Sequence, residues 1–139
     1  MREMIRENII ILVAEDDQGH FILTRNLLRG ENINNEIIWL SDGQKTLDFL
    51  KIQGEDPTRD PQRDYLLLLD IRMPKIDGFE VISKIRSDAV LKEIPVIVIT
   101  TSDFPDNITR CEELGCAGYM IKPLGQDFIK TLKRVASTI

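Results

Sequence analysis

The chain has 139 residues, the size of one ordinary domain with its own core, and its 42% hydrophobic and 29% charged residues are typical of a globular protein. The net charge of −5 argues against direct nucleic-acid binding, which needs a basic surface. No apolar run is long enough to span a membrane, so we expect a cytoplasmic protein without a membrane partner.

The first strand and helix are predicted from residues 9–30. The uninterrupted apolar run 9–14 is typical of a strand buried on both faces of a sheet. Asp17 suits the N-terminal cap of the following helix, and Gly30 suits its C-terminal cap. His20 is predicted to be an ordinary surface residue of this helix. We assign the apolar part of the helix to four residues: Phe21, Leu23, Leu27 and Leu28.

Residues 36–40 predict the second strand. Either Ser41 or Asp42 can cap the helix that follows it. That helix runs through Thr46, Leu47, Phe49 and Leu50. The polar segment 53–64 contains two prolines and a glycine, so we expect a long surface loop within one domain.

The third strand, 65–69, ends at Asp70, and a turn with Pro74 and Gly78 follows it. The helix after the turn places three apolar residues on one face: Phe79, Ile82 and Ile85. Residues 94–100 predict the fourth strand, with Pro95 at its start, where a missing N–H does least harm.

The last part of the chain predicts a helix, a short strand and a final helix. Asp103 can cap the first of these helices, with Pro105 in its first turn and Gly115 as its stop. The apolar residues of this helix are Ile108, Cys111 and Leu114. The fifth strand spans 118–121, and Lys122-Pro123 breaks it. The final helix buries Phe128, Ile129, Leu132, Val135 and Ala136.

Five strands alternate with five helices, which predicts an α/β fold. With right-handed crossovers, the usual solution is a flavodoxin-like doubly wound (βα)5 fold with a parallel sheet in strand order 2-1-3-4-5. Ligands bind such sheets beyond the carboxyl ends of the strands, where the winding direction reverses. That point lies between the first and third strands.

Polar residues end four of the predicted strands or follow them directly. They are Glu15, Asp16, Asp70, Thr100 and Lys122. Because the carboxyl ends of parallel strands meet at one edge of the sheet, we expect one site built from these residues. Thr101 competes with Thr100 for its place, and only the direction of the pleat separates the two.

Clustered carboxylates repel one another unless a cation or a proton relieves the charge. Oxygen ligands favour a hard ion, so we predict Mg²⁺ at Glu15, Asp16 and Asp70, with the backbone carbonyl of Arg72 as a further ligand. A carboxylate can also form an aspartyl phosphate. Lys122 and the Thr100 hydroxyl would then hold phosphoryl oxygens.

In these motifs the chain resembles the receiver domain of two-component response regulators. The resemblance covers nearly all of residues 1–139 as a single receiver domain, with no output domain visible. It implies that Asp70 accepts phosphate from a sensor histidine kinase or phosphotransfer protein and that Lys122-Pro123 is a cis peptide. It also implies that Thr100 moves toward the phosphoryl group and that the aromatic Tyr119 turns inward when the switch is activated. The first acid is Glu15 where many family members have Asp.

The resemblance implies a phosphoacceptor regulatory domain, not a turnover enzyme. The face formed by the last two helices and the fifth strand would bind a downstream protein target, and homodimerisation through the last helix and strand is compatible with the sequence. The long polar loop is similar to that of single-domain receivers paired with phytochrome-type kinases. Arg72 stands where phosphatases with an aspartyl nucleophile usually have a second Asp, which argues against that class. A docking module that works without phosphorylation stays open as the alternative function.

Overall fold

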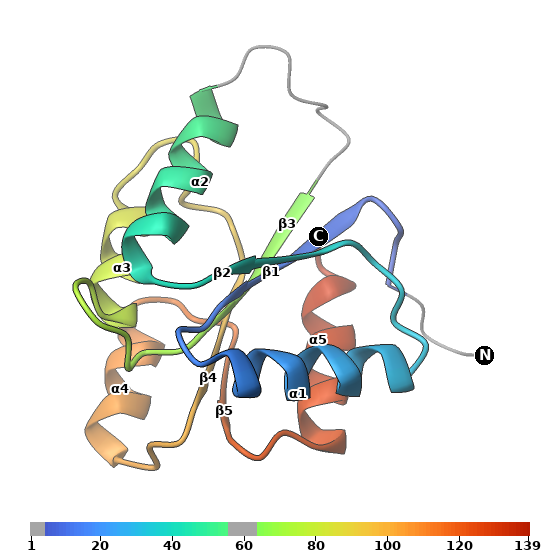
Figure 1. The fold of residues 1–139 in the computed structure, drawn as a ribbon. Helices are drawn as coiled ribbons and strands as arrows, with labels where there is room; N and C mark the ends of the chain where they lie inside the picture. The colour runs from blue at the N-terminus through green and yellow to red at the C-terminus, as the bar shows by residue number, and fades with distance from the viewer. Residues whose placement is uncertain (1–4, 56–63) are drawn as a thin grey trace.

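The computed structural model describes residues 5–55 and 64–139, in which five strands alternate with five helices (Figure 1). The strands are β1 (Ile9–Ala14), β2 (Ile37–Leu40), β3 (Asp64–Leu69), β4 (Val96–Thr100) and β5 (Gly118–Ile121). The helices are α1 (Gln18–Gly30), α2 (Gly43–Glu55), α3 (Gly78–Arg86), α4 (Pro105–Glu113) and α5 (Gln126–Ala136). Within the described ranges, no helix combines the length and the apolar character needed to cross a membrane.

The strands form one parallel sheet in the order β2-β1-β3-β4-β5. This is the predicted doubly wound (βα)5 topology, and the prediction is confirmed. The winding direction reverses between β1 and β3, so a crevice is expected beyond their carboxyl ends. The register pairs Ala14 with Leu69, and the next residues on the two strands, Glu15 and Asp70, are therefore neighbours.

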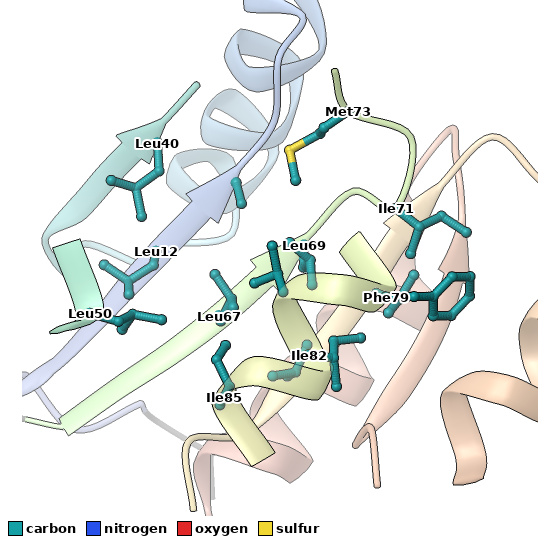
Figure 2. Close-up of a cluster of buried hydrophobic side chains, with 14 of the residues drawn as sticks. Leu12, Leu40, Leu50, Leu67, Leu69, Ile71, Met73, Phe79, Ile82 and Ile85 are labelled. Carbon is teal, nitrogen blue, oxygen red and sulfur yellow. The ribbon is translucent and has the colours of Figure 1, made fainter. Parts of the chain in front are cut away.

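Helices cover both faces of the sheet, which explains why its strands are apolar throughout. Side chains such as Leu12 and Leu67 pack with α2, α3 and α4 on one face. Their sequence neighbours, such as Val13 and Leu68, pack with α1 and α5 on the other. Figure 1 shows the same division, and Figure 2 shows Leu67 of β3 and Ile82 of α3 in the first of these layers.

A close backbone approach positions the turn after β3. A side chain at Gly78 would bring its Cβ within 2.6 Å of the Ile71 Cα and 2.8 Å of the Asp70 carbonyl oxygen, so only glycine fits there. The Gly78 N–H donates to the Ile71 carbonyl oxygen at 3.0 Å. Asp77 caps α3 by accepting from the Glu80 N–H at 2.9 Å. The start of α3 is therefore packed directly against the backbone of Asp70.

The prediction that Leu23 belongs to the apolar face of α1 is wrong, because its side chain is 68% exposed. The buried residues of α1 are Phe21, Thr24 and Leu28, which follow helical spacing. Leu23 lies two residues from Phe21 and so falls on a different side of the helix. Leu27 packs partly against the core, as predicted.

Several predicted boundaries and caps also need correction. The helix α2 runs to Glu55 and β3 begins at Asp64, so the ends of the predicted loop 53–64 belong to regular elements, and residues 56–63 lie outside the described residues. β2 and β4 begin at Ile37 and Val96, later than predicted. Of the two candidate caps of α2, the Asp42 carboxylate accepts from the Lys45 N–H at 2.7 Å.

The predicted caps of α1 and α4 are each correct at one end and wrong at the other. Asp17 caps α1 by accepting from the His20 N–H at 2.9 Å, but Gly30 is the last helical residue and the left-handed conformation falls at Asn32 (φ 61°). Pro105 fixes the first turn of α4, so Phe104 and not Asp103 is the cap residue, with no side-chain hydrogen bond. Gly115 (φ 74°) follows the end of that helix, as predicted.

Candidate functional site

The sheet brings three charged side chains together at its carboxyl edge. Glu15 follows β1, Asp70 follows β3 and Lys122 follows β5. The Asp70 N–H donates to the Ala14 carbonyl oxygen at 2.9 Å, and the Lys122 N–H donates to the Thr100 carbonyl oxygen at 2.7 Å. Continued strand pairing therefore fixes where each of these side chains begins. The predicted cis peptide at Lys122-Pro123 is present.

The Lys122 ammonium bridges the two buried carboxylates. Its Nζ donates to Asp70 Oδ2 at 3.0 Å and to Glu15 Oε1. The side chains are 9% exposed for Lys122, 8% for Asp70 and 1% for Glu15, so the ion pairs are largely withdrawn from water. The other oxygen of the Asp70 carboxylate, Oδ1, accepts from the Arg72 N–H at 2.9 Å. Both oxygens of Asp70 are thus oriented by donors.

Burial dominates the electrostatics of Glu15. It raises the pKa of this carboxyl from 4.5 to about 7, and the nearby charge of Asp70 acts in the same direction. The hydrogen bond from Lys122 and a weak one from the Asp17 N–H, 3.3 Å from Oε2, lower the pKa and offset part of the effect. Glu15 can therefore change its charge near neutral pH.

Thr100 and its competitor Thr101 lie in different surroundings. Thr100 is fully buried at the end of β4, where its Oγ1 accepts from the Ser102 N–H at 3.3 Å. Thr101 is exposed and lines a pocket next to the charged cluster. Thr100 is therefore the buried member of the pair at the end of β4, and its role at the site stays a prediction.

Tyr119, the predicted aromatic switch, links β5 to the segment that follows β4. Its hydroxyl donates to the Ser102 carbonyl oxygen at 2.7 Å. The ring packs partly against the core, and burial raises the pKa of the phenol. Because Ser102 also donates to the Thr100 hydroxyl, Tyr119 and Thr100 are joined through one residue.

The group of possible metal ligands differs from the predicted set. Among the described residues, the ligand atoms of Glu15, His20 and Asp70 lie within 4.8 Å of one another. Asp16, a predicted ligand, is exposed and is not part of this group. Arg72 contacts Asp70 through its backbone N–H, and a role for its carbonyl oxygen stays a prediction.

Sequence reasoning missed two residues of the site. His20, predicted to be an ordinary surface residue, has its Nδ1 3.2 Å from Lys122 Nζ and 3.7 Å from Glu15 Oε1. Trp39 of β2 donates from Nε1 to the Glu15 carbonyl oxygen at 2.6 Å and stacks on Phe21 at 4.9 Å. The sequence did hold a signal for His20. Because α1 begins shortly after Glu15, its first turn, which contains His20, lies at the carboxyl edge of the sheet together with the acids.

A pocket of about 390 Å³ opens beside the charged cluster, between α1 and the segment after β5. His20 and Lys122 form its charged end. Its other lining residues are mostly apolar, and they are Leu23, Thr24, Leu27, Thr101, Pro123 and Leu124. The exposed Leu23 side chain is therefore part of a concave apolar surface next to the two acids.

The family model of the response regulator receiver domain matches residues 11–134 of the chain. The chain belongs to this family. Receiver domains are regulatory domains of two-component signalling and not, in general, enzymes, and they interact with histidine kinases or phosphotransfer proteins and with downstream targets. The family binds Mg²⁺ or Mn²⁺ at an acidic pocket.

Individual receivers support the assignment. The chain is 37% identical over 127 residues to the probable methanogenesis regulatory protein FilR2 of Methanothrix harundinacea, covering 91% of this chain and 80% of the relative. It is 36% identical over 129 residues to response regulator Rcp1 of Synechocystis sp., with 92% and 86% covered.

Solved receivers show the same similarity. The Mn²⁺-bound form of Rcp1 matches with a TM-score of 0.71 and 35% identity, over 94% of this chain and 90% of the other. The phosphorylated cyanobacterial phytochrome response regulator RcpA matches with a TM-score of 0.70 and 30% identity, over 93% and 89%. The predicted likeness to phytochrome-associated receivers is thus confirmed as a similarity.

Proposed function

We propose that this chain is a phosphorylation-activated signalling switch in which Asp70 accepts the phosphoryl group. The contacts of the Asp70 carboxylate carry the proposal. The Arg72 N–H orients one oxygen at 2.9 Å, and the Lys122 ammonium holds the other at 3.0 Å. A nucleophile held beside a positive charge, at the edge where ligands bind this fold, suits phosphoryl transfer.

The transfer is a substitution at phosphorus. A carboxylate oxygen of Asp70 forms the new O–P bond while the P–N bond of a donor phosphohistidine breaks, and the donor imidazole takes up a proton. Lys122 would pair with the phosphoryl oxygens, and the buried hydroxyl of Thr100 would donate to one of them. When bound, Mg²⁺ or Mn²⁺ neutralises charge on the phosphoryl oxygens.

The donor set fits such a cation. Glu15 and Asp70 offer buried carboxylates at the same edge, and a cation beside them would favour the charged form of Glu15, whose pKa is raised by burial and by the charge of Asp70. The backbone carbonyl of Arg72 would be a further ligand. Asp16 would join them by turning its exposed side chain toward the site.

The contacts of Tyr119 suggest how the phosphoryl group would reach the outer surface. If the Thr100 hydroxyl turns toward the phosphoryl group, it leaves the Ser102 N–H, and Ser102 also carries the carbonyl oxygen that holds Tyr119. We infer that this coupling favours an active arrangement of the face formed by α4, β5 and α5, which binds a downstream protein. Phe104 and Ile121 expose apolar side chains in this region.

The apolar pocket beside Asp70 suits the docking of the phosphodonor protein, a histidine kinase or phosphotransfer protein. Leu23 is 68% exposed and lines this pocket. Leu23→Glu should slow transfer from a phosphohistidine protein that labels the wild type and leave labelling by acetyl phosphate unchanged. Equal slowing with both donors would show that the substitution damages the site itself, and no change with either would remove this surface from the proposal.

Intact mass spectrometry after incubation with acetyl phosphate tests the proposed function. The wild type should gain one phosphoryl group with Mg²⁺ present and none with the metal chelated. Asp70→Asn should gain none, whereas Asp103→Asn, which changes an exposed carboxylate outside the site, should behave as the wild type.

The result also separates the switch from its alternative. A folded wild-type protein that gains no phosphoryl group from acetyl phosphate or from phosphoramidate contradicts the switch and favours a docking module that works without phosphorylation. Labelling that persists in Asp70→Asn would move the acceptor to another residue.

A further inference from the structure

We propose that His20 Nδ1 is a direct metal ligand and that it makes the site of this chain select a first-row transition-metal ion, such as Mn²⁺ or Co²⁺, over Mg²⁺. This inference rests on the proposed function, because it concerns the cation of the same site. The family binds its cation at an acidic pocket, and the histidine would add a nitrogen ligand to it.

Three possible ligand atoms face one point that a positive charge already occupies. Lys122 Nζ contacts Asp70 Oδ2 at 3.0 Å, His20 Nδ1 at 3.2 Å and Glu15 Oε1. The ligand atoms of Glu15, His20 and Asp70 lie within 4.8 Å of one another. The ammonium thus marks a position from which one cation reaches two carboxylates and an imidazole, and a metal ion bound there would displace Lys122 Nζ toward the phosphoryl oxygens with which it is proposed to pair.

The contact with Lys122 also bears on the tautomer of the imidazole. An ammonium group can only donate hydrogen bonds, so at 3.2 Å the contact suits the tautomer in which Nδ1 carries a lone pair and Nε2 carries the proton. A neutral imidazole nitrogen with its lone pair directed at the site is the form that binds metals.

The backbone around His20 is fixed independently of the charged cluster. The His20 N–H is the donor that Asp17 caps, at 2.9 Å, so the first turn of α1 holds His20 beside the end of β1. The side chain is 42% exposed and lines the pocket next to the site. An ion from solvent can therefore reach Nδ1 without opening the core.

The nitrogen changes which ion the site prefers. Mg²⁺ is bound mainly by oxygen ligands, whereas imidazole suits transition-metal ions, whose affinity for a given nitrogen and oxygen site rises from Mn²⁺ to Co²⁺. Asp16, the third predicted carboxylate, is exposed and outside the group. Whether or not Asp16 turns toward the site, the imidazole makes the donor set mixed, and a mixed nitrogen and oxygen set favours Mn²⁺ and Co²⁺ more than carboxylates alone would.

Calorimetric titration of the metal-free full chain with Mg²⁺, Mn²⁺ and Co²⁺ tests the proposal. His20→Ala should weaken Co²⁺ binding by at least about tenfold, the loss typical when even a supporting group of a metal site is removed. Binding of Mn²⁺ should weaken by a smaller factor and that of Mg²⁺ by the smallest. Gln18→Ala, an exposed change in the same helical turn, should leave all three affinities as in the wild type.

Pulsed electron paramagnetic resonance of the Mn²⁺-loaded chain provides a readout that a merely structural role would not move. The wild type should show hyperfine coupling from a directly bound ¹⁴N nucleus, and His20→Ala should lose it. Thermal unfolding of both variants without metal confirms that they fold.

The outcomes separate this inference from the proposed function. Equal weakening of all three ions in His20→Ala, or a wild type without ¹⁴N coupling, overturns the role of His20 and leaves a metal-dependent switch intact. A wild type that binds none of the three ions overturns both the inference and the metal requirement of the proposed function.

Discussion

At the scale of single residues, Lys122 is what allows two acids to be buried side by side. An isolated buried carboxylate would destabilise the folded state strongly, and two neighbouring ones would also repel each other. The Lys122 ammonium contacts both Glu15 and Asp70, so removing it would leave both charges without their partner. Desolvation still leaves Glu15 with a pKa of about 7.

That pKa predicts how stability depends on pH. The folded-state pKa of Glu15, about 7, lies above the ordinary value of 4.5, so the folded state binds more protons between these values. The contribution of Glu15 to the free energy of unfolding is therefore fully present below 4.5 and is lost as the pH rises through about 7.

Urea unfolding of the metal-free chain measures this effect. From about pH 5 to about pH 8 the wild type should lose more stability than Glu15→Gln, which cannot titrate. Parallel curves for the two proteins would show that Glu15 is ionised throughout this range. Because a protonated carboxyl binds metal poorly, Mg²⁺ affinity should rise over the same range.

The residue scale is also where sequence reasoning reached its limit. Asp70, Thr100 and Lys122 could be found because each ends a strand or follows one directly, and the fold brings strand ends together. The exposed position of Asp16 and the inward position of His20 depend on which way individual side chains turn, and no periodicity encodes that. Helical spacing predicts an exposed Leu23 only if the polar Thr24 is placed in the buried face of α1, together with Phe21 and Leu28.

At the scale of elements, the cap of α3 supports the loop that holds Asp70. The Asp77 carboxylate accepts from the Glu80 N–H at 2.9 Å, and the next residue, Gly78, packs against the Asp70 backbone. Asp77→Ala should lower the free energy of unfolding by about 1 kcal/mol, measured by urea denaturation. Asp77→Asn should retain most of the stability, since asparagine caps helices about as well, and equal losses in both variants would contradict the capping role.

The link between β5 and the segment after β4 gives a second prediction at this scale. Tyr119→Phe removes the donor to the Ser102 carbonyl oxygen, which should reduce stability by about 0.5–1.5 kcal/mol. Hydrogen exchange should become faster in residues 101–104 than in the core strands. Wild-type exchange there would show that this hydrogen bond does not hold the segment.

At the scale of the whole molecule, metal binding should stabilise the fold, because the ligands come together only when the sheet has formed. Mg²⁺ or Mn²⁺ at about 100 times its dissociation constant should raise the free energy of unfolding by about 2.7 kcal/mol. Thermal unfolding at increasing metal concentration measures this rise, and Asp70→Asn should show a smaller one. A midpoint that does not move with metal in the wild type would contradict the proposed cation site.

The whole-molecule architecture was the most predictable level. Apolar runs buried on both faces, alternating with helical periods, lead to one common topology, and the parallel order 2-1-3-4-5 follows from right-handed crossovers. The first and last residues of the helices and strands were harder to predict, because local contacts determine where each one begins and ends. Pro105 moves the start of α4 past Asp103, and α2 continues to Glu55 despite the glycine within it.

Reductive trapping followed by peptide mapping tests the central claim most directly. Borohydride converts an aspartyl phosphate into homoserine, which marks the acceptor residue by mass. After incubation with acetyl phosphate and Mg²⁺, we predict homoserine at position 70 and at no other aspartate, and none in a sample without the metal. Homoserine at another position, or a phosphoryl group that resists this chemistry, would contradict the assignment of Asp70 as the phosphoacceptor.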